Sequence, residues 1–197
     1  MYKKILLGVV VLSLSICTLH NFAQAASIPP RQTANKVNTT FPHWRKSPIS
    51  VYIPKDDNAA AMQRAFLRWQ RESSGKAAFK FVEDEKNADV NVTFAEKVDG
   101  SDGPIGAYNL TISGMEIQKA EIILATKSPN IKKYSRNYIF TVMLHEIGHI
   151  LGMSDNQRKP SSIMYMPVSE EQDIMKIDIR KLYTINGWSY NNRNFNN

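Results

Sequence analysis

Two histidines and a glutamate have the spacing of a metal site that carries its own base. His145 and His149 lie four residues apart, and Glu146 directly follows the first histidine. Side chains four residues apart on a helix project from the same face, with Cβ atoms about 5–6 Å apart, so one Zn²⁺ can accept a nitrogen from each ring. Glu146 can then reach a water on the metal without being a ligand. The pattern predicts a zinc site with a catalytic base.

The residues that follow extend this site to a third ligand. Gly152 can end the helix in a left-handed turn, and the reversed chain can bring Asp155 back to the metal. We therefore predict His145, His149 and Asp155 as ligands of one catalytic zinc ion, because three protein ligands leave a fourth position open for water. Glu146 is predicted to be the general base, which takes the proton of the metal-activated water and hands it to a departing amine.

The helix that must position these residues is predicted to be buried on every side. It begins near Ser135 or Asn137, ends at Gly152, and carries apolar residues around its circumference. Its histidines and Glu146 would then be polar groups placed in the interior. A match to H-E-x-x-H arises by chance in roughly one chain in a hundred, and buried histidines alone are more often core residues than ligands. The helix, the glycine and the third carboxylate together favour the metal site.

Further elements are expected around this helix. Apolar alternation predicts strands over Ile49–Ile53, Ala78–Val82, Asp89–Phe94 and Ala120–Ala125. Asp57 or Asn58 can cap a first helix that ends at Gly75. The buried face of this helix is predicted to carry Met62, Ala65, Phe66 and Trp69.

A final helix is predicted near the C-terminus. Ser169 and Gln172 have the spacing of a capping box at its start, and Gly187 lies near its expected end. Its inward residues are predicted to be Ile174, Ile177, Leu182 and Ile185.

A loop rich in glycine and proline precedes the last predicted strand. Asp99 and Asp102 in this loop are candidate calcium ligands, but their spacing does not match the twelve-residue calcium loop. An ordinary cluster of turns is therefore favoured, with calcium as the weaker alternative.

The first 25 residues have the parts of a secretory signal peptide. Lys3 and Lys4 precede the apolar run Ile5–Leu19, and Ala23–Ala25 supplies the small residues that a signal peptidase requires. A membrane anchor is disfavoured because it would need roughly 20 apolar residues, and the polar His20 and Asn21 end the run too early. A lipoprotein is disfavoured because Cys17 follows an isoleucine rather than a small residue. We expect cleavage after Ala25 and a secreted, extracellular protein without stable membrane insertion, with the cell wall as a further location.

Composition limits the class of protein and its partners. Cleavage of the 197-residue chain after Ala25 leaves 172 residues, enough for one domain with its own core. Cys17 is the only cysteine, so packing and bound metal, rather than disulfides, would hold the secreted domain. The formal charge of +7 is spread along the chain without an aromatic-interleaved basic array, which excludes nucleic acid as an expected partner. We expect a monomer that acts on a protein or peptide.

His145–Asp155 resembles the signature of the metzincin zinc peptidases. That signature is H-E-x-x-H-x-x-G-x-x-H, and the form that ends in aspartate is similar to that of snapalysin. Ser162–Tyr165 resembles the family's Met-turn, in which a methionine, here Met164, forms a hydrophobic floor under the zinc.

The resemblance covers about residues 49–188. The Ile49–Pro54 strand, the helix of Trp69 and the Ala88–Val92 strand occur in the order found in matrixin catalytic domains. It implies an α/β (α+β) fold of the metzincin-type zincins, with a twisted, mostly parallel sheet, an antiparallel edge strand, a buried active-site helix and a C-terminal helix. The segment 26–48 is then an extended arm or short propeptide, 49–188 a zinc metallopeptidase domain, and 189–197 a flexible tail.

The resemblance also implies where a substrate lies. An extended peptide would pair with an edge strand at Ala120–Leu124, and Tyr165–Pro167 would line the pocket beyond the cleaved bond. As an alternative, Ala120–Leu124 is a core strand whose edge is covered.

Several residues depart from the family pattern. Asp155 removes about one positive charge relative to a third histidine, which should acidify the water less. Met166 stands where astacin-like and serralysin-like relatives carry a tyrosine, and Tyr165 is a doubtful substitute. The mature chain has only His43 to spare, so no second, structural zinc is expected, and without a cysteine there can be no cysteine switch.

These observations predict a secreted zinc-dependent endopeptidase. The alternative is a catalytically weak metal-binding or cell-wall-associated protein that keeps the zinc site, although such a protein would not need Glu146. A third possibility is a peptidase that processes a single partner, and specificity depends on pocket shape that the sequence does not show.

Overall fold

The computed structural model describes residues 41–98 and 105–189. The predicted signal peptide, most of the predicted arm, Asp99 and Asp102, and nearly all of the predicted tail lie outside the described residues.

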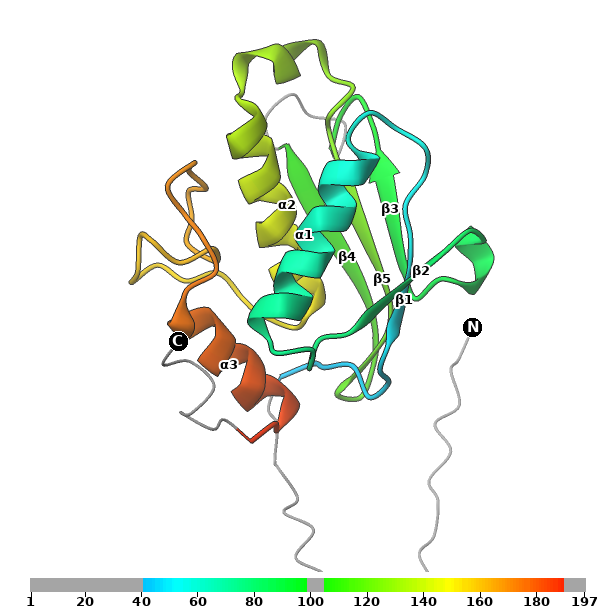
Figure 1. The fold of residues 1–197 in the computed structure, drawn as a ribbon, viewed down its shortest axis with the longest axis vertical. Helices are drawn as coiled ribbons and strands as arrows, with labels where there is room; N and C mark the ends of the chain where they lie inside the picture. The colour runs from blue at the N-terminus through cyan, green and yellow to red at the C-terminus, as the bar shows by residue number, and fades with distance from the viewer. Residues whose placement is uncertain (1–40, 99–104, 190–197) are drawn as a thin grey trace, which may run out of the picture. The chain divides into compact units, whose positions relative to one another are not determined.

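A five-stranded sheet in the order β2-β1-β3-β5-β4 forms the scaffold (Figure 1). Its strands are β1 (Ile49–Tyr52), β2 (Phe79–Val82), β3 (Val90–Phe94), β4 (Gly106–Ser113) and β5 (Glu116–Leu124). The first three and β5 pair in parallel, whereas β4 runs antiparallel to β5. This arrangement confirms the predicted α/β fold with a mostly parallel sheet and an antiparallel edge strand.

The edge strand is not the one that the sequence suggested. Ala120–Leu124 belongs to β5, which lies inside the sheet because Ala120 pairs with Val90 on one side and with Leu110 on the other. The prediction that a peptide pairs along Ala120–Leu124 is therefore wrong, since the backbone groups of this segment are already used within the sheet. β4 is the edge strand on this side of the sheet. It escaped prediction because none of its residues is buried and its hydrophobic alternation is weak.

Two helices cover one face of the sheet, as Figure 1 shows. The helix α1 (Ala59–Glu72) follows Asn58 and buries its predicted face in full. The Nε1 of Trp69 on α1 donates a hydrogen bond of 2.9 Å to the carbonyl oxygen of Leu144, which joins α1 to the helix α2 (Arg136–Ile150). This bond fixes the depth at which the central helix lies in the core.

The central helix α2 is buried as predicted. The hydroxyl of Ser135 accepts a hydrogen bond of 3.0 Å from the backbone N–H of Tyr138 and so caps the first turn. Every residue from 141 to 150 is buried. A helix with no solvent-facing side over these turns can hold ionisable groups only where other groups compensate them.

The last helix, α3 (Lys176–Asn186), begins later than predicted. Gln172 does not cap it, because its side-chain amide donates instead to the carbonyl oxygen of Pro167. The later start also changes the inward face, so that Ile177 is 42% exposed while Ile179 is buried. The predicted end is confirmed, since Gly187 has a left-handed φ of 64° directly after the helix.

The end of α2 is covered by the chain that precedes β1. Trp44 is buried and its Nε1 donates a hydrogen bond of 2.7 Å to the carbonyl oxygen of Ile150. His43 pairs through its backbone with Met115 and Ile117. The described end of the segment predicted as an arm thus lies against the domain.

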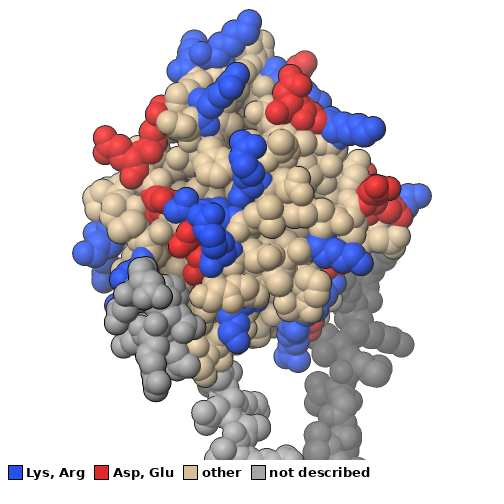
Figure 2. Space-filling view, in the orientation of Figure 1, with Lys and Arg blue, Asp and Glu red and all other residues tan. Residues whose placement is uncertain are grey.

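Charged side chains are distributed over the surface seen in Figure 2. Lys and Arg side chains occur at several places across this face, with Asp and Glu among them. Within the described ranges, no helix is long and apolar enough to cross a membrane.

Candidate metal centre

The three predicted ligands converge on one point. The Nε2 atoms of His145 and His149 lie 3.0 Å apart, and Oδ1 of Asp155 lies 3.4 Å from the first and 3.2 Å from the second. Tetrahedral zinc with bonds of about 2.0–2.1 Å separates its ligand atoms by about 3.3–3.4 Å. In the part of the chain that the structure describes, this is the one group of three such side chains close enough to hold a metal ion.

Hydrogen bonds to carbonyl oxygens orient both histidine rings. Nδ1 of His145 lies 2.7 Å from the carbonyl oxygen of Ile163, and Nδ1 of His149 lies 2.9 Å from that of Met153. A carbonyl oxygen can only accept, so Nδ1 carries the hydrogen in each neutral ring and Nε2 is an acceptor. Two imidazole lone pairs and a carboxylate oxygen therefore face one another, an arrangement that a cation satisfies. The residues present fit zinc.

The end of α2 brings Asp155 to the histidines. Gly152 has a φ of 90°, a left-handed conformation that favours glycine. A β-carbon there would also stand 2.1 Å from the carbonyl oxygen of Pro42. The backbone N–H of Met153 bonds the carbonyl oxygen of Gly148, and the chain then turns back toward the rings. The glycine is required for the turn and for the close passage of the preceding chain.

Burial sets the protonation of the site in the metal-free protein. It lowers the pKa of His145, and it lowers the pKa of His149 to about 4, with a further contribution from the charge of His145. Both rings are therefore neutral at neutral pH, the state in which imidazole binds metal. Burial, followed by the charge of Asp155, raises the pKa of Glu146 to about 8.

Glu146 lies in a cleft of about 350 Å³ between α2, the start of β4 and the segment after Met164. The backbone of β4 passes close over it, because a β-carbon on Gly106 would stand 2.5 Å from Oε1 of Glu146. The carboxylate is thus held between helix and edge strand, beside the predicted ligands. Met166 and Pro167 line the cleft as predicted, whereas Tyr165 is not among its lining residues.

Tyr108 on β4 is a member of the cleft that the sequence reasoning missed. Its ring stacks on the ring of His149, with centroids 4.1 Å apart and an interplanar angle of 15°. Burial, followed by the charges of Asp155 and Glu146, raises the pKa of its hydroxyl. A prediction of β4 as a strand would have placed Tyr108 on the same face as Gly106, because alternate residues of a strand share a face.

The buried carboxylate of Asp178 accepts hydrogen bonds from the predicted Met-turn. The side chain of Asp178 on α3 accepts hydrogen bonds from the Ser162 hydroxyl, the Ile163 N–H and the Met175 N–H. Burial raises the pKa of this carboxyl group, and the hydrogen bonds oppose that rise. Since Ile163 is also the partner of His145, Asp178 supports a predicted ligand through one residue. No sequence motif pointed to it.

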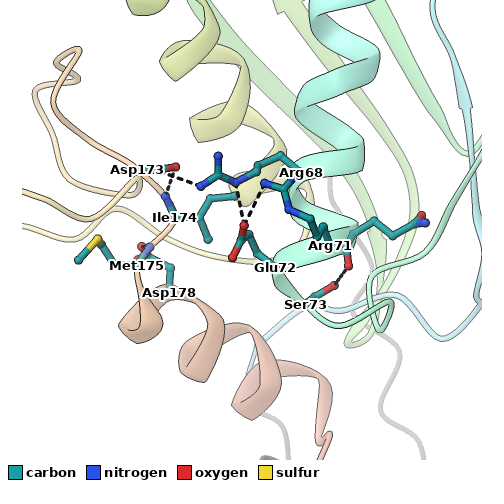
Figure 3. Close-up of polar contacts among 9 residues, drawn as sticks. Arg68, Arg71, Glu72, Ser73, Asp173, Ile174, Met175 and Asp178 are labelled. Carbon is teal, nitrogen blue, oxygen red and sulfur yellow. Dashed lines mark hydrogen bonds and ion pairs between the residues drawn. The ribbon is translucent and has the colours of Figure 1, made fainter. Parts of the chain in front are cut away.

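An arginine ties α1 to the chain between the Met-turn and α3, as the close-up in Figure 3 shows. Arg68 pairs with Glu72 at 2.9 Å within α1 and with Asp173 at 2.8 Å. The backbone N–H of Asp173 bonds the carbonyl oxygen of Ser161. The ion pair therefore holds Asp173, which follows the cleft-lining residues Met166–Val168 in the chain, against α1.

Comparison of the sequence with known protein families agrees with this geometry. The sequence matches the matrixin family over residues 32–186. A probable matrix metalloproteinase of Invertebrate iridescent virus 3 is 32% identical over 112 residues, which are 53% of this chain and 30% of the viral protein. An archaemetzincin from Methanopyrus kandleri is similar in structure with a TM-score of 0.45 and 13% identity, over 73% of this chain and 98% of that one. Since the family match spans most of the sequence and includes the metal-centre helix, the chain belongs to the matrixin family.

Proposed function

We propose that this protein is a zinc-dependent endopeptidase in which Glu146 is the general base. The observation that carries the proposal is the convergence of His145, His149 and Asp155 beside a buried carboxylate that is not a ligand. A protein that only bound metal would gain nothing from burying Glu146, because an unpaired buried carboxylate costs stability. Membership of the matrixin family supports the same activity.

The residues of the site have separate parts in this reaction. A zinc ion held by the three ligands would supply Lewis acidity toward water and toward a peptide carbonyl. Glu146 accepts the proton of the attacking water and then donates it to the departing amine. The carbonyl oxygens of Ile163 and Met153 orient the histidine rings so that their Nε2 atoms face the position of the metal.

The outer edge of β4 is the place for an extended peptide. β4 pairs with β5 on one side and has no partner strand on the other among the described residues. A peptide added to this edge would use main-chain hydrogen bonds for affinity and would lie beside Glu146. The adjoining cleft, lined by Val142 and Met166–Val168, can receive one of its side chains.

Export is a further part of the proposal. It is supported by the signal-peptide pattern that ends at Ala25. N-terminal sequencing of protein recovered from the medium of expressing cells tests it, and we expect the sequence to begin at Ala26.

Casein digestion with and without a zinc chelator tests the activity. We expect chelation to abolish cleavage and zinc to restore it. Glu146→Gln should retain one zinc per chain and lose activity by about 10²- to 10⁴-fold, the contribution of a positioned base. Glu170→Gln, which alters an exposed glutamate, is the matched control and should cleave like the wild-type protein.

Two results would contradict the proposal. Cleavage that survives both chelation and Glu146→Gln would show that another site performs the reaction. A wild-type protein that binds zinc and cleaves no peptide would instead be a metal-binding protein that keeps the site.

A further inference from the structure

The cleft contains a hydroxyl group for which the reaction above has no use. Tyr108 is 39% exposed, and its ring covers one face of His149. It lines the cleft together with Glu146 and Asp155. Within the described part of the chain, its hydroxyl has no hydrogen-bond partner, so this donor is free to meet a ligand.

The alternation of β4 directs Tyr108 toward the catalytic helix. Gly106, Tyr108 and Leu110 share one face of the strand. A β-carbon on Gly106 would meet Glu146 and Val142. The side chain of Leu110 packs against the core. Tyr108 lies between them and reaches α2 about one turn beyond Glu146, where His149 is found.

The other uncharged donor in the cleft is too far along the helix to act at the same point. Apart from Tyr108, Tyr138 is the one hydroxyl-bearing side chain among the described residues that line the cleft. It precedes His145 by seven residues, which corresponds to about 10 Å along the helix axis. Its ring stacks on Tyr134, with centroids 4.9 Å apart. Tyr108 therefore supplies the hydroxyl at the end of the cleft where the predicted metal ligands lie.

We propose that Tyr108 is a catalytic residue whose hydroxyl donates a hydrogen bond to the carbonyl oxygen of the scissile peptide bond as that oxygen gains negative charge. Its ring at the same time holds His149 in place. The inference rests on the proposed peptidase function. No proton leaves Tyr108, because the proton that moves passes through Glu146. A donor fixed in position before the reaction stabilises the developing charge without reorganisation.

Kinetics of Tyr108→Phe on a fluorogenic peptide, beside Tyr108→Ala and the control Tyr134→Phe, test this role. Tyr108→Phe should lower kcat by about 10²-fold, as the loss of one such donor does, with KM and zinc affinity unchanged. Tyr134 is outside the cleft lining, so Tyr134→Phe should match the wild-type protein. Tyr108→Ala should also weaken zinc binding in competition with a chelator, because the stack on His149 is lost.

A phosphinic peptide, which mimics the tetrahedral state, provides a readout besides activity. Its inhibition constant should rise for Tyr108→Phe by a factor similar to the loss of kcat. If the wild-type protein is active and Tyr108→Phe has unchanged kcat and inhibitor affinity, the role of Tyr108 is overturned while the peptidase function stands. The same holds if Tyr165→Phe, rather than Tyr108→Phe, loses kcat. A wild-type protein that cleaves no peptide would overturn the proposed function and this inference with it.

Discussion

The sulfur of Met164 lies against Gly148 of the central helix α2. A β-carbon on Gly148 would stand 2.2 Å from this sulfur and 3.3 Å from Cζ2 of Trp69. Met164 itself has no exposed surface. The glycine is thus a packing requirement, because the helix and the Met-turn could not approach this closely with a larger residue between them.

Gly148→Ala should destabilise the protein, although alanine normally favours a helix over glycine. The extra methyl group must displace Met164, and overpacking of this kind costs about 1–3 kcal/mol. Urea unfolding measures the change. In a Met164→Ala background, which removes the obstructing sulfur, the same substitution should cost less, and strictly additive effects would contradict the contact.

Asp178→Asn should weaken both the fold and the metal centre. The amide cannot accept all the hydrogen bonds that the carboxylate receives from Ser162, Ile163 and Met175, and unpaired buried donors cost about 1–3 kcal/mol. Zinc affinity should fall by about 10-fold or more because Ile163 orients His145. Thermal melts of the metal-free protein and chelator competition measure the two effects.

A neighbouring aspartate is the matched control for this substitution. Asp173 has a side chain that is 48% exposed and pairs with Arg68 at the surface. Asp173→Asn should cost less than about 1 kcal/mol and should leave zinc affinity unchanged. Equal losses in the two variants would show that Asp178 has no special relation to the ligand.

Gly106→Ala should lower activity while the metal remains bound. The new β-carbon would stand 2.5 Å from Oε1 of Glu146 and 2.7 Å from Cγ1 of Val142, so β4 or the carboxylate must move. If Glu146 is the general base, as proposed, its displacement removes most of its contribution, so we expect kcat to fall by about 10²-fold. Zinc content should stay at one per chain. Full activity in this variant would show that the strand does not restrain Glu146.

The stability of the metal-free protein should fall as pH rises from 6.5 to 8. The folded state keeps the Glu146 proton up to about pH 8, whereas the ordinary pKa of this group is 4.5. The folded state therefore binds more protons between these values and loses stability as pH increases. His149 has the opposite effect between about 4 and 6.5, because its pKa is lowered by folding. His145, whose pKa is also lowered, acts in the same direction. The histidine contribution levels off only about one pH unit above 6.5, and over this range it is smaller than the fall attributed to Glu146.

Urea unfolding in the presence of a chelator measures this dependence. One proton corresponds to about 1.4 kcal/mol per pH unit, so the loss between pH 6.5 and 8 should reach up to about 2 kcal/mol. Glu146→Gln has no proton to lose, so it should be more stable at pH 8 and should show only the small rise with pH that the two histidines contribute. An unchanged slope in Glu146→Gln would assign the effect to another group, such as Asp178.

Local patterns predicted much of the fold. The buried face of α1, the glycine ends at Gly152 and Gly187, and the start of α2 at one of its two predicted caps, Ser135, were all readable because each depends on residues within one or two helical turns. The start of α3 was predicted wrongly, since Ser169 and Gln172 have the pattern of a capping box but Gln172 bonds elsewhere.

The order of strands was outside the reach of local reasoning. β4 carries many exposed side chains, and its place at the edge follows from its hairpin with β5 and from the pairing of β5 with β3. Backbone pairing between distant segments leaves little trace in the pattern of a single strand. The edge on this side of the sheet is therefore β4 and not Ala120–Leu124.

Helical spacing was enough to predict the metal site, because it puts His145 and His149 on one face with Glu146 beside them. The surroundings of these residues became visible only in the folded chain. The meeting of Asp155 with both rings, the support from Asp178 and the stacking of Tyr108 on His149 join segments far apart in the chain. Such contacts depend on how packed layers meet, and no short-range periodicity encodes them.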